Sequence, residues 1–252
     1  MLVVVASSWD EAARTLVKRW EPHGAGLLTV NDLSRAGWAH YLEDPDRSRA
    51  VIGGRVVATG DISGVLTRLP AVTDQELSAI VAEDRAYAAT EMTAFLMYWL
   101  STLECPVLNQ PSASCLCGPS WRPEQWTLAA SRLGLPVAPR RRHTPPFGQG
   151  ISAAMDEPLF SFPDTHTGVV QMTVIGDRCI GAGDEELARQ ARLLATAPGV
   201  DLLAVVFSGP EAGSQFVDAH LWVDVSHDAV EESLLDYFSS HAHTSSLQGG
   251  GA

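Results

Sequence analysis

The chain has 252 residues, of which 46% are hydrophobic, and a formal net charge of −13 at pH 7. This length and hydrophobic content suffice for one large α/β domain or two small ones, each with a core. The acidic balance argues against nucleic acid and anionic membranes as partners, and no apolar run is long enough to span a membrane.

The first seventy residues alternate short apolar runs with helical segments. The run LVVVA at 2–6 predicts a strand buried on both faces, and it lacks the basic flank and cleavage site of a signal peptide. The segment 9–20 then predicts a helix, capped by Ser7 or Ser8. Further elements are predicted in chain order: a strand at 25–30, a hairpin over 50–60 that turns at Gly53-Gly54, and a strand at 64–69.

A long helix is predicted at 83–103, after a helical stretch that opens at Asp74. Its second half is apolar around the whole axis, which predicts burial on more than one side. One side would meet the strands, and the other would be covered by the C-terminal unit or by another copy of the chain. The residues concerned are Ala94, Phe95, Met97, Tyr98, Trp99 and Leu100.

A short strand at 106–111 and a proline-opened, glycine-ended helix at 122–134 complete the N-terminal domain, 1–138. This alternation predicts a mostly parallel sheet with helices on its faces. The composition then changes, because 139–165 is rich in proline and glycine and is interpreted as an irregular connector.

A smaller C-terminal α/β unit is predicted over 166–242. Its elements in order are a hairpin at 168–181 that turns at Gly176-Asp177, a helix at 184–197, strands at 200–208 and 215–225, and a final helix from His227 to His241. The tail 243–252 is predicted to be disordered.

This order of elements resembles the ATP-grasp superfamily, the carboxylate–amine ligases that include glutathione synthetase. The segment from CPVLNQP to LGLPV is similar to the strand, loop and helix that end the family's first domain. VVQMTVIGDRCIGA, GVDLLAV and FVDAHLWVDV are similar to strands of its ATP-binding core. The resemblance implies an ATP-grasp-like fold with a truncated C-terminal core.

Several departures from the family argue against nucleotide chemistry. The segment 139–168 is too short to hold the family's lysine-bearing subdomain, and Lys18, the sole lysine, lies at the other end of the chain. Gln171 stands where the family has a phosphate-facing arginine. Since cations supply most of the catalysis in phosphoryl transfer, we expect no nucleotide cofactor.

Three residues match the family's metal-binding positions: Asp201, Asp218 and His220. This set of two oxygen ligands and one nitrogen ligand suits zinc or manganese better than magnesium, so a divalent metal is one interpretation. The other is a solvated strand face. If 216–225 is one regular strand, Phe216, Asp218, His220, Trp222 and Asp224 share a side, and the intervening apolar residues face the core.

Two other sequence features are candidate sites. Arg140, Arg141 and Arg142 can bind phosphate or a carboxylate-rich peptide, with Gln171 as a further ligand-binding residue, although a solvated basic loop explains the arginines equally simply. Cys115 and Cys117 form C-x-C with no partner histidine that the sequence can place. This pattern favours incidental or buried thiols over a nucleophile or a metal site, in a cytoplasmic protein with reduced cysteines.

The functional prediction is therefore a non-catalytic ATP-grasp-like protein that binds a peptide or protein partner, in peptide maturation. It would act as a homo-oligomer or in complex with an active ligase. Two alternatives remain open: an ATP-dependent carboxylate–amine ligase with a minimal site, and a small metal-dependent enzyme built on Asp201, Asp218 and His220.

Overall fold

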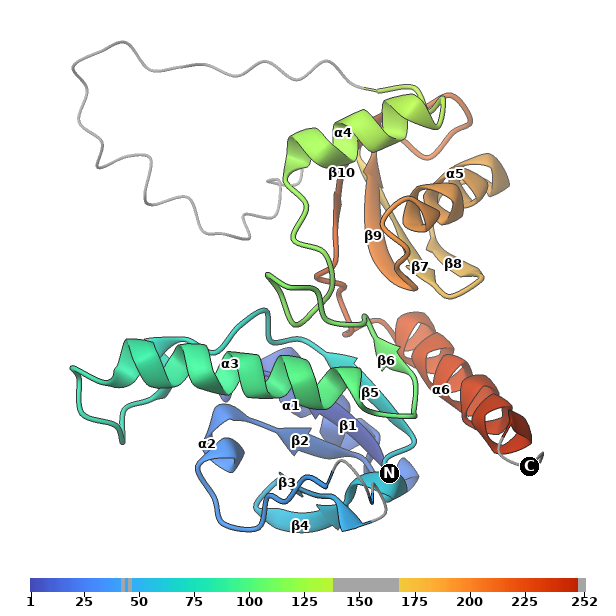
Figure 1. The fold of residues 1–252 in the computed structure, drawn as a ribbon. Coiled ribbons are helices and arrows are strands. Elements are labelled where there is room, and N and C mark those ends of the chain that lie inside the picture. The colour runs from blue at the N-terminus through green and yellow to red at the C-terminus, as the bar shows by residue number, and fades with distance from the viewer. Residues whose placement is uncertain (42–43, 45–46, 138–167, 249–252) are drawn as a thin grey trace, which may run out of the picture.

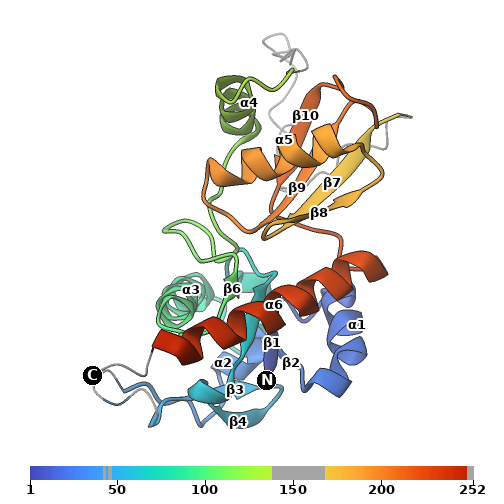
Figure 2. The same cartoon turned by 90° about the vertical axis from the view of Figure 1, so that its right-hand side faces the viewer.

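The computed structural model describes residues 1–41, 44, 47–137 and 168–248, with side chains up to residue 241. The predicted connector lies outside these residues, and with it Arg140, Arg141 and Arg142. Two four-stranded sheets form the two units of the protein (Figures 1 and 2). Among the described residues, no helix combines the length and apolar character that a membrane crossing requires.

The N-terminal unit is built on a parallel sheet with strand order β2-β1-β5-β6. Its strands are β1 (Leu2–Val5), β2 (Gly26–Leu28), β5 (Gly64–Thr67) and β6 (Val107–Leu108), and its helices are α1 (Glu11–Arg19), α2 (Val30–Leu33) and α3 (Arg85–Ser101). The predicted hairpin is confirmed as β3 (Arg49–Ile52) and β4 (Arg55–Ala58). Three-residue 3-10 turns lie at Glu21–His23, Thr59–Asp61 and Asp74–Glu76.

The C-terminal unit is an antiparallel sheet with strand order β10-β9-β7-β8. It comprises β7 (Val170–Ile175), β8 (Arg178–Gly181), α5 (Glu185–Thr196), β9 (Leu202–Phe207), β10 (Phe216–His220) and α6 (Asp228–Gln248). This confirms the predicted element order. The last helix continues to Gln248, beyond its predicted end, and only 249–252 of the tail lie outside the described residues.

Two helices pack on the sheet of the unit to which the sequence did not assign them. The predicted domains place α4 (Pro123–Arg132) in the N-terminal unit and α6 in the C-terminal unit. α4 packs Trp126 and Ala130 against Phe216 and Ala219 of β10. α6 lies with α1 on one face of the parallel sheet (Figure 2), and it also contacts β7 and β8 of its own unit. The sequence of an amphipathic helix shows which of its faces is apolar. It does not show which of the two sheets that face packs against.

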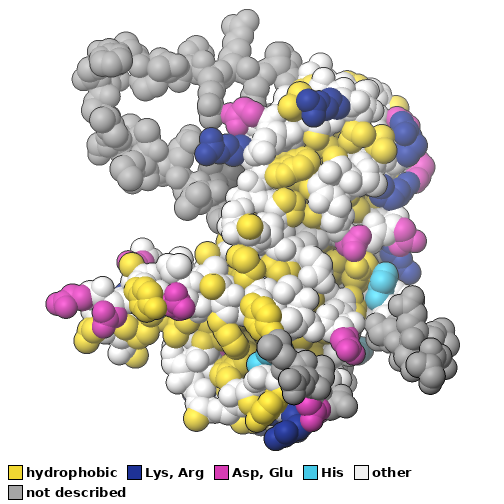
Figure 3. All heavy atoms as spheres, viewed as in Figure 1, with side chains coloured by type: hydrophobic (Ala, Val, Ile, Leu, Met, Phe, Trp, Pro, Cys, Tyr) yellow, Lys and Arg dark blue, Asp and Glu magenta, His cyan; other side chains and the backbone are white. Residues whose placement is uncertain are grey.

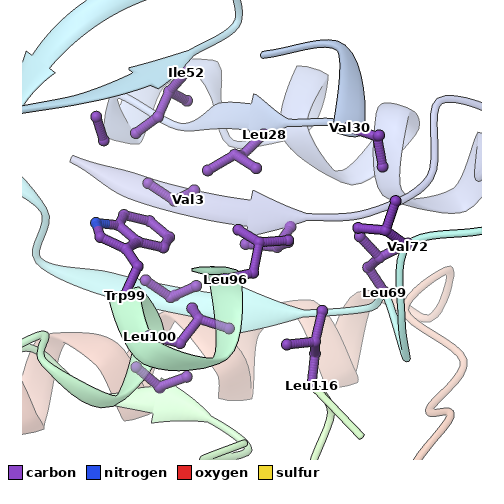
Figure 4. Close-up of a cluster of buried hydrophobic side chains, with 14 of the residues drawn as sticks. Val3, Leu28, Val30, Ile52, Leu69, Val72, Leu96, Trp99, Leu100 and Leu116 are labelled. Carbon is purple, nitrogen blue, oxygen red and sulfur yellow. The ribbon is translucent and has the colours of Figure 1, made fainter. Parts of the chain in front are cut away.

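The opposite face of the parallel sheet is covered by α3. Leu96, Trp99 and Leu100 are buried there against Val3 and Leu28 of the sheet (Figure 4).

The other side of α3 carries exposed residues, among them Ala94, Tyr87 and Tyr98. Hydrophobic side chains gather over this helix on the surface (Figure 3). The expectation that the C-terminal unit covers this side is wrong, because α4, α5 and α6 pack elsewhere. Cover by another copy of the chain stays a prediction.

Candidate functional site

The candidate site lies on the face of the C-terminal sheet opposite α4 and α5. Gln171 and Asp218 flank Val206 across three strands, and Thr173 and His220 flank Ala204 in the next row. Neighbouring strands are about 4.8 Å apart, so the Cα atoms that flank each row are separated by about 10 Å. Gln171, Thr173, Asp218 and His220 are called the polar face below. Thr173 is buried, and the other three are half-buried.

A bulge in β10 sets which side chains reach the polar face. Phe216 pairs with Phe207, but Asp218 pairs with the next residue, Val206, so Val217 is an extra residue on this strand. Phe216 therefore lies in the core beneath α4, on the side away from Asp218. The prediction that Phe216 shares a side with Asp218 and His220 is wrong for this reason.

The strand is also shorter than predicted, because it ends at His220. The following residues leave the sheet and cross to the N-terminal unit. Val223 and Val225 are buried there in the cluster formed with α1 and α6. The alternation of apolar residues therefore continues past the end of β10, because Val223 and Val225 are buried in the core of the N-terminal unit and not in the C-terminal sheet.

Asp201 does not join the polar face. It precedes β9 by one residue and lies three positions from Ala204, the partner of His220, which is about 10 Å along a strand. Its carboxylate Oδ2 instead accepts a hydrogen bond from the Tyr237 hydroxyl at 2.8 Å. Burial is the largest cause that raises the pKa of Tyr237 above its ordinary value, and this carboxylate adds to it.

The described side chains provide no metal site with three ligands from His, Cys, Asp and Glu. The structure thus does not bring together the predicted set of Asp201, Asp218 and His220. Burial holds the pKa of His220 below its ordinary value of 6.5, against the opposing charge of Asp218. The imidazole is therefore neutral at neutral pH, and the net charge of the polar face comes from Asp218.

Strands β7 to β10 bring little positive charge to the polar face. Arg178 is the single Lys or Arg within strands β7 to β10, and its guanidinium is ion-paired with Asp236 of α6 at 2.5 Å. The negative charges of a polyphosphate would be repelled by the Asp218 carboxylate, and the uncharged Gln171 would not offset this repulsion. An amide, a hydroxyl, a carboxylate and a neutral imidazole suit the hydrogen-bonding groups of a peptide instead.

A buried ion pair lies at the carboxyl ends of the parallel strands. Arg68 Nε donates to Asp10 Oδ2 at 2.9 Å, and the two side chains are 6% and 8% exposed. Arg68 also donates to the Val223 carbonyl at 2.8 Å, and its guanidinium lies 4.5 Å from the centre of the Trp222 ring. The pair therefore anchors the segment after β10 to the N-terminal unit.

Sequence reasoning missed this pair. The signal available was an arginine directly after the apolar strand at 64–67, where an exposed charge would be unexpected. The predicted cap, Ser7 or Ser8, is wrong, because Asp10 caps α1: the Ala13 N–H donates to Asp10 Oδ1 at 2.9 Å. The second oxygen of Asp10 binds Arg68.

Comparison with solved structures places the fold. Macrocyclase MdnC from Microcystis aeruginosa MRC, bound with precursor peptide MdnA, is similar at a TM-score of 0.65 with 11% identity, over 95% of this chain and 99% of that one. ATP-grasp ligase PsnB, complexed with a phosphomimetic variant of a minimal precursor, Mg and ADP, gives 0.63 with 15% identity, over 96% and 97%.

A RiPP-associated ATP-grasp ligase from Chryseobacterium gregarium, in complex with ADP and a leader and core peptide, gives a TM-score of 0.61 with 12% identity, over 95% of this chain and 96% of that one. No protein-family model and no curated protein sequence matches the chain. The fold is ATP-grasp-like, as the resemblance implied, with a parallel sheet in the N-terminal unit and an antiparallel sheet in the C-terminal unit.

Proposed function

We propose that this chain is a non-catalytic ATP-grasp-like protein that binds a peptide or protein partner in peptide maturation. The observation that carries the proposal is the composition of the polar face, which has Gln171, Asp218 and His220 where nucleotide chemistry needs cations and a metal-binding set. The neighbours of known structure include ligases solved with precursor peptides, which supports a peptide as the partner class.

Calorimetric titration with ATP and Mg²⁺ tests the non-catalytic part of the proposal. We expect a dissociation constant weaker than about 100 μM, which corresponds to about −5.5 kcal/mol. Tighter binding, with release of ADP in the presence of a peptide, would instead support the alternative of a ligase with a minimal site.

Fluorescence polarisation with labelled synthetic peptides, copied from the open reading frames beside the gene, tests the peptide part. Asp218→Asn should change the affinity of a bound peptide at least several-fold, because Asp218 carries the net charge of the polar face. The matched control is Asp177→Asn, the same change in the exposed turn between β7 and β8. Equal affinities for the two variants would place the peptide elsewhere.

Assembly with a second copy or with an active ligase is part of the same proposal. The exposed side of α3, with Tyr87 and Tyr98, is the apolar surface that supports it (Figure 3). Light scattering at micromolar concentration checks the homo-oligomer, and a monomeric mass would leave only the complex with another protein.

A further inference from the structure

The loop that leaves β6 brings two cysteines close together at the junction of the two units. Ser112 and Cys115 exchange backbone hydrogen bonds of 2.9 and 3.3 Å, which closes the first part of the loop. Leu116 and Cys117 then lie at the centre of a turn. The ends of this turn are residues 115 and 118, and a turn keeps its end Cα atoms within about 7 Å of each other. The Cα atoms of Cys115 and Cys117 are closer still, in the range that a disulfide can bridge.

The loop is held on both sides by contacts within the core. Leu116 is fully buried, and its N–H donates to the Pro70 carbonyl at 2.8 Å. The Cys117 carbonyl accepts from Asn109 Nδ2 at 3.3 Å, and the Gly118 carbonyl accepts from the Ser112 hydroxyl at 2.8 Å. The two thiols are therefore presented in a defined arrangement.

The two thiols differ in a way that suits a reactive pair. Cys115 is half-buried, so part of its side chain is accessible to solvent, whereas Cys117 is buried. A hydrogen bond from the Cys117 side chain is the largest cause that lowers the pKa of Cys115 to about 7. The same bond and burial hold the pKa of Cys117 well above its ordinary value, against the charge of Arg68.

We propose that Cys115 and Cys117 form a dithiol site that closes reversibly to a disulfide by exchange with small-molecule disulfides. The Cys115 thiolate attacks one sulfur of the incoming disulfide and expels the other half as a thiolate. The Cys117 thiol then loses its proton to solvent and attacks Cys115 Sγ, which releases the second half. Two cysteine thiols are oxidised, and one external disulfide is reduced to two thiols.

This assignment is independent of the proposed peptide-binding function. It also differs from the expectation from sequence, which favoured incidental thiols, because spacing alone could not show that the loop turns at 116–117. The other two cysteines offer an internal comparison. Cys105 and Cys179 are half-buried, and burial raises the pKa of each to about 11.

The test incubates the full chain with a glutathione redox buffer, blocks the remaining thiols with N-ethylmaleimide and maps the peptides by mass spectrometry. We expect an internal disulfide between Cys115 and Cys117, with Cys105 and Cys179 alkylated. A disulfide that involves Cys105 or Cys179, or four alkylated cysteines across the whole range of buffers, would overturn the proposal. This measurement needs no variant and so does not depend on how substitutions fold.

Two variants then test the separate roles. Cys117→Ser should accumulate a mixed disulfide between Cys115 and glutathione, because the resolving thiol is missing. Cys115→Ser should leave Cys117 unmodified, because Cys117 is buried. Circular dichroism verifies that both variants are folded. Modification of Cys117 in folded Cys115→Ser, at a rate equal to that of Cys115 in Cys117→Ser, would contradict the assignment of Cys115 as the attacking thiol.

Discussion

Asn109 is the residue whose loss should most directly weaken the connection between the two units. It directly follows β6 and is 4% exposed. Its amide Nδ2 donates to the Leu202 carbonyl at 2.9 Å and to the Cys117 carbonyl at 3.3 Å. Its Oδ1 accepts from the N–H groups of Leu202 at 2.8 Å and Asp201 at 3.1 Å. One side chain thus pairs both backbone groups of Leu202 at the start of β9.

The expected cost of Asn109→Ala follows from these bonds. Leu202 is 3% exposed, so its N–H and C=O would be left buried without a partner. Each such group costs about 1–3 kcal/mol, so the two together cost about 2–6 kcal/mol, and the two longer bonds add less. For a chain of this size, this predicts a melting temperature lower by roughly 4–24 °C.

Urea unfolding followed by circular dichroism and by tryptophan fluorescence measures this cost. The matched control is Asn31→Ala in α2, where the asparagine is exposed, and it should change the stability by less than about 0.5 kcal/mol. If Asn109→Ala costs no more than Asn31→Ala, the side chain of Asn109 does not connect β6 to β9 as described.

Three further predictions concern charged and titratable groups. Arg68→Met should cost about 3–5 kcal/mol in urea unfolding, because it leaves the Asp10 carboxylate buried without its partner, and Asp10→Asn in the same chain should recover part of the loss. Since the pKa of His220 is lower in the folded state, the unfolded state binds its proton first, and the stability should fall as the pH drops below about 6.5. His220→Gln should remove that part of the pH dependence, and an unchanged slope would show that another group causes it. The rate of Cys115 alkylation by iodoacetamide should reach half its maximum at a pH of about 7, with the Cys117 thiol and the Arg68 guanidinium as the facing groups. Cys117→Ala, which removes the donor, should move this midpoint towards 9.0, and a midpoint already at 9.0 in the natural chain would contradict the contact between the thiols.

Local signals predicted most of the secondary structure. The apolar run at 2–6, the Gly53-Gly54 turn and the proline-opened helix α4 all lie where the sequence indicates. These features depend on residues a few positions apart, so the sequence contains the whole signal.

Long-range features were predicted less well. The bulge at Val217 moves Phe216 to the other side of β10, although the alternation of side chains in the sequence is regular. Arg68 and Asp10 are separated by 58 positions, and only the fold shows that they pair. The candidate site was predicted in part, because Gln171, Asp218 and His220 share one face, whereas Asp201 belongs to a hydrogen bond with Tyr237.

The position of α6 on the N-terminal sheet has a consequence for the order of folding during synthesis. Val230, Leu234 and Phe238 cover the same face as Leu2 and Val4, which leave the ribosome more than two hundred residues earlier. At synthesis rates of about 5–20 residues per second, this face stays open for about ten seconds or more. We therefore expect the nascent chain to depend on a chaperone over that interval, and the first half of the protein to be unable to complete its core before the last helix arrives.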